Sequence, residues 1–219
     1  MLFYLTFVSS YLFFSAKCFY NDVIINKNKE ETQNNLEAYY KALPTVLTNV
    51  LFYTIPFFIY IDYIYEPPPF SIIGSLLSIL ITRYCSNIVF YWAHWYSHIN
   101  KELYKYHKIH HEFNHPIGIR TEYSHPIDFI FGNFIPFAIV PILLKTNTPI
   151  LLYLIIHGNY KTINIDYNTP NTKNNHHILH HKYYNCNYGD KWIDEYIKNN
   201  LEIGIQNNFL RYLCPRFNT

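Results

Sequence analysis

Histidines are the residues of this sequence best suited to chemistry. Of its 12 histidines, eight fall into one HxxxH and two HxxHH motifs. They are His94 and His98, then His107, His110 and His111, then His177, His180 and His181. Spacings of three and four place side chains on one helix face, so each cluster directs its imidazoles toward one point. Eight imidazoles are too many for one tetrahedral zinc and predict a dinuclear site with open positions.

A second metal motif overlaps the middle cluster and suggests a different reaction. His111-Glu112-x-x-His115 matches the HExxH of zinc proteases, in which the glutamate is the general base. Pro116 follows at once and disfavours a helical conformation at His115. A membrane metallohydrolase is therefore the less favoured alternative enzyme class. Replacing Glu112 would test it, because Glu112 is the base only in that class.

The composition excludes several other classes of protein. Half of the residues are apolar, 20% are aromatic and only 15% are charged, so the chain cannot stay solvated as a disordered polymer. The net charge of +2 is too small for a phosphate-binding surface, so we expect no nucleic acid partner. The four cysteines form no CxxC, which argues against a disulfide framework and a thiolate zinc site.

The apolar residues are grouped in four blocks that must position the histidines. They cover residues 2–16, 45–61, 70–93 and 129–156. A helix crossing a bilayer needs about 20 residues, so only the third block suffices alone, and the fourth suggests a hairpin of two half-length helices. The first block could alternatively be a signal peptide, although it lacks a basic start. The fold class we predict is all-α: an integral membrane helical bundle with a cytosolic histidine-rich di-metal domain.

Lysine and arginine are distributed unequally between the connecting segments. Segments 17–44 and 99–126 carry four each, and seven more follow from Lys161 onward, whereas 62–69 has none. The positive-inside rule therefore places the histidine clusters on the cytosolic side and segment 62–69 on the opposite side.

The three motifs, in a chain with several apolar blocks, resemble the fatty acid hydroxylase/sterol desaturase superfamily. Segment 107–126, which includes Glu122-Tyr123-x-His125-Pro126, is most similar to the C-4 methylsterol oxidases. The resemblance implies a multi-pass enzyme of the endoplasmic reticulum membrane that oxidises a lipid with O2 at two iron ions, which zinc could replace on purification. It also implies electrons from NAD(P)H, delivered by a reductase and cytochrome b5.

The resemblance further assigns residues. The eight clustered histidines would be metal ligands, and His125 and His157 match two further family histidines and are predicted ligands as well. We expect the hydroxylase-like domain at 70–194, membrane segments and a cytosolic loop at 1–69, and a tail at 195–219.

Some positions depart from the family pattern. Asn87 and Ile178 stand where the family has aspartates, and Trp95 where it has arginine. The missing acids would orient ligand imidazoles, and losing such groups weakens metal binding or activity. The alternatives are therefore a fatty acid or sphingolipid hydroxylase or desaturase of the same superfamily, or a relative that binds metal or lipid without turnover.

Overall fold

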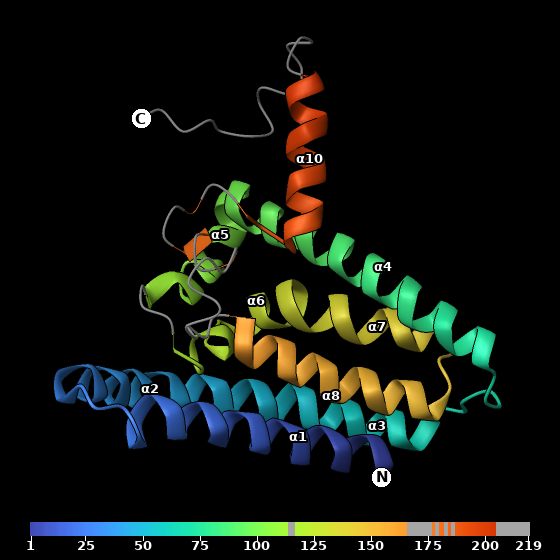
Figure 1. Cartoon of the computed structure of the whole chain (residues 1–219), viewed down its shortest axis with the longest axis horizontal. Coiled ribbons are helices and arrows are strands. Elements are labelled where there is room, and N and C mark those ends of the chain that lie inside the picture. The colour runs from blue at the N-terminus through green and yellow to red at the C-terminus, as the bar shows by residue number, and fades with distance from the viewer. Residues whose placement is uncertain (114–116, 166–176, 178–179, 182–183, 185–186, 205–219) are drawn as a thin grey trace.

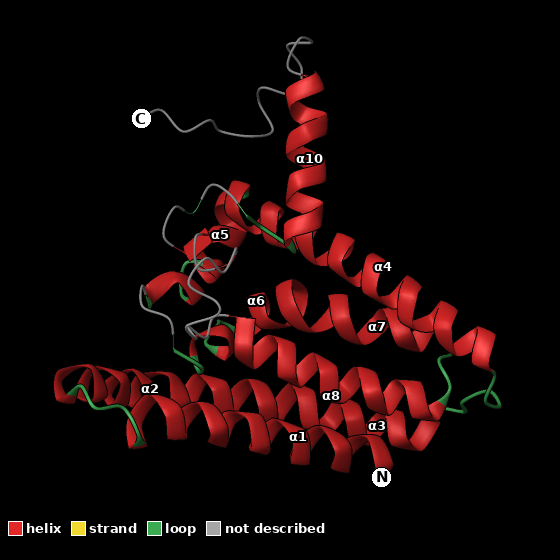
Figure 2. Cartoon of the chain, in the orientation of Figure 1, coloured by secondary structure: helices red, strands yellow, loops and turns green. Residues whose placement is uncertain are grey.

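The computed structural model describes residues 1–113, 117–165, 177, 180, 181, 184 and 187–204. Helices joined by loops make up this part of the chain, and it contains no strand (Figure 2). The predicted all-α class is therefore confirmed. Four helical runs are long and apolar enough to cross a membrane: Leu2–Ile24, Lys29–Ile64, Ile72–Ile99 and Pro126–Leu143.

The first two apolar blocks form two long helical runs that lie side by side (Figure 1). The first run consists of α1 (Leu2–Phe19) and the π-helical turn η1 (Tyr20–Ile24). The second consists of α2 (Lys29–Asn49), the π-helical turn η2 (Val50–Thr54) and α3 (Ile55–Ile64). Asn28 begins this run because its side chain accepts the backbone N–H groups of Glu30 and Glu31.

Helix α4 (Ile72–Ile99) is polar on its inner side and apolar on its outer side. Its buried residues include Ser75, Thr82, Ser86, His94 and Ser97. Leucine, isoleucine and aromatic side chains along its length are exposed. This pattern is the reverse of a soluble helix and suits a helix whose outer face meets lipid. Asn100 ends α4 and caps α5 (Lys101–His107) by accepting the N–H groups of Glu102 and Leu103.

The fourth block is a helical hairpin, as predicted, but its arms are longer than half a span. The first arm comprises α6 (Pro126–Asp128), the π-helical η5 (Phe129–Phe134) and α7 (Ile135–Leu143), which together have 18 residues. The second arm, α8 (Thr148–Ile165), also has 18. Pro126 and Pro136 occupy the first turns of α6 and α7, where a missing N–H costs little, and Pro141 lies inside α7 close to its end.

One end of the bundle is tied together by polar contacts far from the histidine clusters. The Asp62 carboxylate accepts the backbone N–H groups of Phe3 and Tyr4 and pairs with the terminal amine. The Tyr65 hydroxyl donates to the Thr146 carbonyl at 2.7 Å. The N-terminus, the α3–α4 connection and the α7–α8 turn therefore share one end, and the histidines lie near the other (Figure 1). A further helix, α10 (Lys191–Gly204), packs on α4.

Candidate metal centre

Three helical segments bring the predicted ligands together at the end of α4. His94 and His98 lie in its last turns, His107 ends α5, and His110 and His111 lie in the 3-10 turn η3 (His110–Glu112). His177, His180 and His181 approach from the C-terminal part of the chain. All eight imidazoles fall into two groups. Within each group, one ring nitrogen of each histidine lies within 4.8 Å of the corresponding nitrogens of the others.

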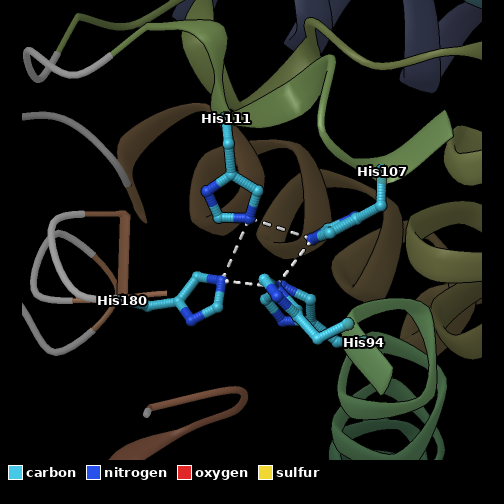
Figure 3. A group of neighbouring side chains, drawn as sticks. His94, His107, His111 and His180 are labelled. Carbon is cyan, nitrogen blue, oxygen red and sulfur yellow. Dashed lines mark hydrogen bonds between the residues drawn. The ribbon is translucent and has the colours of Figure 1, made fainter. Parts of the chain in front are cut away.

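The first group, called here the five-histidine group, contains His94, His98, His107, His111 and His180. The Nε2 atoms of four of them form a ring. Successive Nε2–Nε2 distances are 3.0 Å for His98–His107, 3.0 Å for His107–His111, 3.3 Å for His111–His180 and 3.1 Å for His180–His98. Figure 3 shows four members of the group, His94, His107, His111 and His180, pointing toward one another from different segments.

The second group, the three-histidine group, contains His110, His177 and His181, all buried. The Nε2 atoms of His110 and His181 are 3.0 Å apart. The His110 and His111 ring centroids are 5.4 Å apart, so the two groups are neighbours.

Both groups fit a metal ion better than a network of hydrogen bonds. The His94 Nδ1 atom lies 2.6 Å from the Tyr188 carbonyl and the His107 Nδ1 atom lies 2.8 Å from an Asp128 oxygen. If these nitrogens carry the protons, each Nε2 presents a lone pair to the centre. Lone pairs facing one another repel unless a cation lies between them. Ligands about 2.0–2.1 Å from one ion stand roughly 2.9–3.4 Å apart, which matches the Nε2 spacing.

Residues outside the five-histidine and three-histidine groups orient the imidazoles, and the HxxxH and HxxHH motifs did not reveal these residues. Asp128 holds His107, and the Tyr123 carbonyl lies 3.2 Å from His110 Nδ1. Asp194 accepts the N–H groups of Tyr188 and Gly189 and so fixes the loop whose carbonyl meets His94. An acid three residues beyond His125, at the start of an apolar block, was the available signal for Asp128.

Burial favours the neutral form of these imidazoles, which is the form that can bind a metal ion. Desolvation, followed by the charge of His110, lowers the pKa of both His111 and His181. A metal ligand must be a neutral imidazole, so this environment favours ligation and disfavours protonation.

The two remaining predicted ligands lie outside both groups. His125 Nδ1 accepts the Ile127 N–H at 3.2 Å and so begins the Pro126–Leu143 run. His157 stacks on Tyr153 and lines the cavity beside the centre. Their role as ligands stays a prediction.

Glu112, the base required by the HExxH alternative, also lies outside both groups. Its carboxylate pairs with Lys41 at 2.6 Å and accepts the Tyr123 hydroxyl at 3.0 Å. These two contacts, Lys41 first, hold the pKa of Glu112 below its usual value. His115 lies outside the described residues. The contacts of Glu112 therefore disfavour a hydrolytic base there.

A cavity of about 290 Å³ adjoins the two groups. His94 and His107 of the first group and His110 and His177 of the second line it. α4, α7 and α8 supply most of its other walls, among them Phe90, Phe137 and Leu154. A lipid segment in this space would lie against both groups.

The fold has four helical runs that could cross a membrane, and the site is a histidine-rich cluster that could hold metal. Comparison with known proteins agrees: the fatty acid hydroxylase family model matches residues 79–199. The chain belongs to this family.

Three similar proteins are named for reactions of sterols or very-long-chain aldehydes. Methylsterol monooxygenase 1 of Rattus norvegicus is 32% identical over 187 residues, covering 75% of this chain and 61% of the relative. Lathosterol oxidase of Homo sapiens is 28% identical over 130 residues, covering 55% and 43%. A very-long-chain aldehyde decarbonylase of Oryza sativa subsp. indica is 37% identical over 68 residues, covering 31% and 24%. The chain thus spans less than two thirds of each of these relatives. No solved structure matches it.

Proposed function

We propose that this protein is a membrane-bound, O2-dependent lipid oxygenase with two iron ions. The observation that carries the proposal is the meeting of eight imidazoles, seven of them buried and that of His98 half-buried, in two adjacent groups beside a cavity. The five-histidine group would hold one ion and the three-histidine group the other. His125 and His157 would support this centre from its edges.

Two ferrous ions would supply the redox chemistry that activates O2 toward an unactivated C–H bond. One oxygen atom enters that bond to form an alcohol. The other leaves as water, with two protons and two electrons from NAD(P)H through a reductase and cytochrome b5. The chain's own part is to hold its imidazoles neutral and fixed, and to exclude bulk water with the apolar walls of the cavity.

For the substrate we propose a sterol, oxidised at a C4-methyl group. The support is the similarity to methylsterol monooxygenase 1, which covers more of this chain than the other two relatives named above. A fatty acid or sphingolipid hydroxylase or desaturase is the alternative within the same family. A relative without turnover is the other alternative. Asn87 lines the cavity and Ile178 is outside the described residues, but Asp128 supplies a carboxylate to His107. This contact favours an intact centre.

We further propose that the protein lies in the endoplasmic reticulum membrane with the histidines on the cytosolic side. Lysines cluster in the segments next to the histidine end, and segment 62–69 at the opposite end has none. Glycosylation acceptors inserted near Lys101 and near Glu66 test this in microsomes. Modification near Glu66 alone is expected, and modification near Lys101 alone would reverse the topology.

The function is tested by loading the full chain, purified in detergent, with iron under argon. We expect close to two iron ions per chain, and O2 consumption that depends on a reductase, cytochrome b5 and a 4-methylsterol. The matched control is Glu112→Gln, which should retain turnover because no hydrolytic base is needed. Two bound metals with no oxidised product from sterols, fatty acids or ceramides would instead favour the relative without turnover.

A further inference from the structure

The cavity beside the histidine groups has a polar, cationic side that the oxidation of a hydrocarbon does not require. Arg83 of α4 and Lys161 of α8 both line it, together with Asn87. Arg83 is the twelfth residue of the 28-residue α4, about halfway along a helix that can span the membrane. A charged side chain at such a depth is costly and is retained where it serves a pathway or a ligand.

Two hydroxyl groups on α4 also indicate that the cavity binds a polar ligand. Thr82 and Ser86 line the cavity and are 6% and 2% exposed. Neither hydroxyl has a hydrogen-bond partner among the described residues. Ser97 on the same helix behaves differently, because it donates to the Ala93 carbonyl at 2.9 Å. Two buried hydroxyls are therefore free to bind a polar group inside the cavity.

Among the described residues that line the cavity, the two cations, both of which are exposed, are not fully balanced by acidic groups. In the described part of the chain neither Arg83 nor Lys161 forms an ion pair. Asp190 also lines the cavity, but it is one acid against two cations. Asp128, the other acid in the wall, is already bound to His107. An anion is the ligand that such a surface would attract.

We propose that this cationic side of the cavity binds the anionic head group, carboxylate or phosphate, of a lipid whose apolar part lies against Ile79, Phe90, Phe137 and Leu154. Arg83 and Lys161 would pair with the anion, and the Thr82 and Ser86 hydroxyls would donate to it. The inference rests on the proposed function, because it specifies the lipid that this same site oxidises. It favours the fatty acid alternative named above over a neutral 4-methylsterol, because only a lipid with an acidic group can pair with these two cations.

The test is a binding competition that needs no turnover. The full chain in a neutral maltoside detergent binds radiolabelled oleate, which is then displaced by unlabelled oleate, oleyl alcohol or oleoyl lysophosphatidic acid. Oleate should compete at least about tenfold better than the alcohol, since a hydrogen bond to a charged group is stronger than one to a neutral group. Stronger competition by lysophosphatidic acid than by oleate would assign the anion as a phosphate, and the reverse as a carboxylate.

Variants locate the binding group. Arg83→Gln and Lys161→Gln should each weaken oleate about tenfold and leave the alcohol unchanged, whereas Arg83→Lys should keep most of the affinity. The matched control is Lys105→Gln, which removes an exposed lysine paired with Glu102 on α5 and should change neither ligand. If Arg83→Gln fails to fold, Lys161→Gln on a separate helix gives the same readout.

Equal affinity for oleate and the alcohol in the unmodified protein, or equal losses in Lys105→Gln, would overturn the inference. Failure of the proposed function would give a different result. The purified chain would then lack two bound iron ions, or it would not consume O2. Iron and O2 consumption without anion preference would refute the head-group site alone. Anion preference without turnover would refute the oxygenase alone.

Discussion

The five-histidine and three-histidine groups are neighbours, but they differ in the number of imidazoles and in the share of them that lines the cavity. The first surrounds its centre with imidazoles from α4, α5, η3 and His180, and two of its members are anchored by Tyr188 and Asp128. The second has three ligands, of which His110 has the longer contact of 3.2 Å to a backbone carbonyl. Two of its three members line the cavity, against two of five in the first group. The comparison predicts a position surrounded by five imidazoles beside a position that is more open to the cavity.

This asymmetry has a chemical consequence. An ion with three protein ligands keeps positions for a small molecule, whereas five imidazoles nearly fill a coordination sphere. We therefore expect O2 and the substrate to meet at the three-histidine group. The five-histidine group would act mainly as the stable partner.

The largest effect is expected from removing a ligand of the three-histidine group. His181→Ala leaves two imidazoles there, too few to hold an ion firmly. The iron content should fall from about two to about one per chain, and turnover to background. Elemental analysis and O2 consumption measure both, with Glu112→Gln as the control from the edge of the site. Two tightly held ions in His181→Ala would show that the groups are not separate metal positions.

Removing a ligand of the five-histidine group should be less severe. His111→Ala leaves four imidazoles, so the ion stays bound at saturating iron, with an affinity lower by at least about a hundredfold, the upper end of the cost of losing an outer-shell partner. A chelator time course reveals the difference: in the unmodified protein the three-histidine ion leaves first, and in His111→Ala the other ion leaves sooner than before, so the interval between the two releases shortens. An unchanged interval would argue against the assignment of His111.

The sequence predicted which histidines lie together better than it predicted which groups orient them. The HxxxH and HxxHH spacings place imidazoles on one helix face, so His94, His98 and the two HxxHH triplets could be found from periodicity alone. The contacts of Asp128 and the Tyr188 carbonyl depend on tertiary packing between segments 21 and 94 residues apart. No local pattern records such contacts. The same limit applies to Arg83. It lies in an apolar block of the sequence, and only the packing of α4 against α8 reveals that it lines the cavity.

A smaller effect is expected from the support of the five-histidine group. In Asp128→Asn the side-chain oxygen can still accept the His107 Nδ1–H, but the charge is lost. Loss of such support typically costs roughly 10–100-fold in metal affinity, and we expect the lower end of that range. Metal titration of each position measures it. Asp62→Asn, at the opposite end of the bundle, should leave both affinities unchanged, and an equal loss there would point to general destabilisation.

The smallest effect concerns His125, which lies outside both groups. His125→Ala removes the acceptor of the Ile127 N–H at the start of the Pro126–Leu143 run. Loss of such a cap costs about 1 kcal/mol, or roughly 2–4 °C in Tm for a chain of this size, with the iron content unchanged. His125→Asn should restore Tm because asparagine is a strong N-cap residue. Thermal unfolding in detergent and elemental analysis separate the two roles. If both variants lose one iron ion, His125 is a ligand, as its match to the family indicates. The three-histidine group would then have four histidines, against five in the other group.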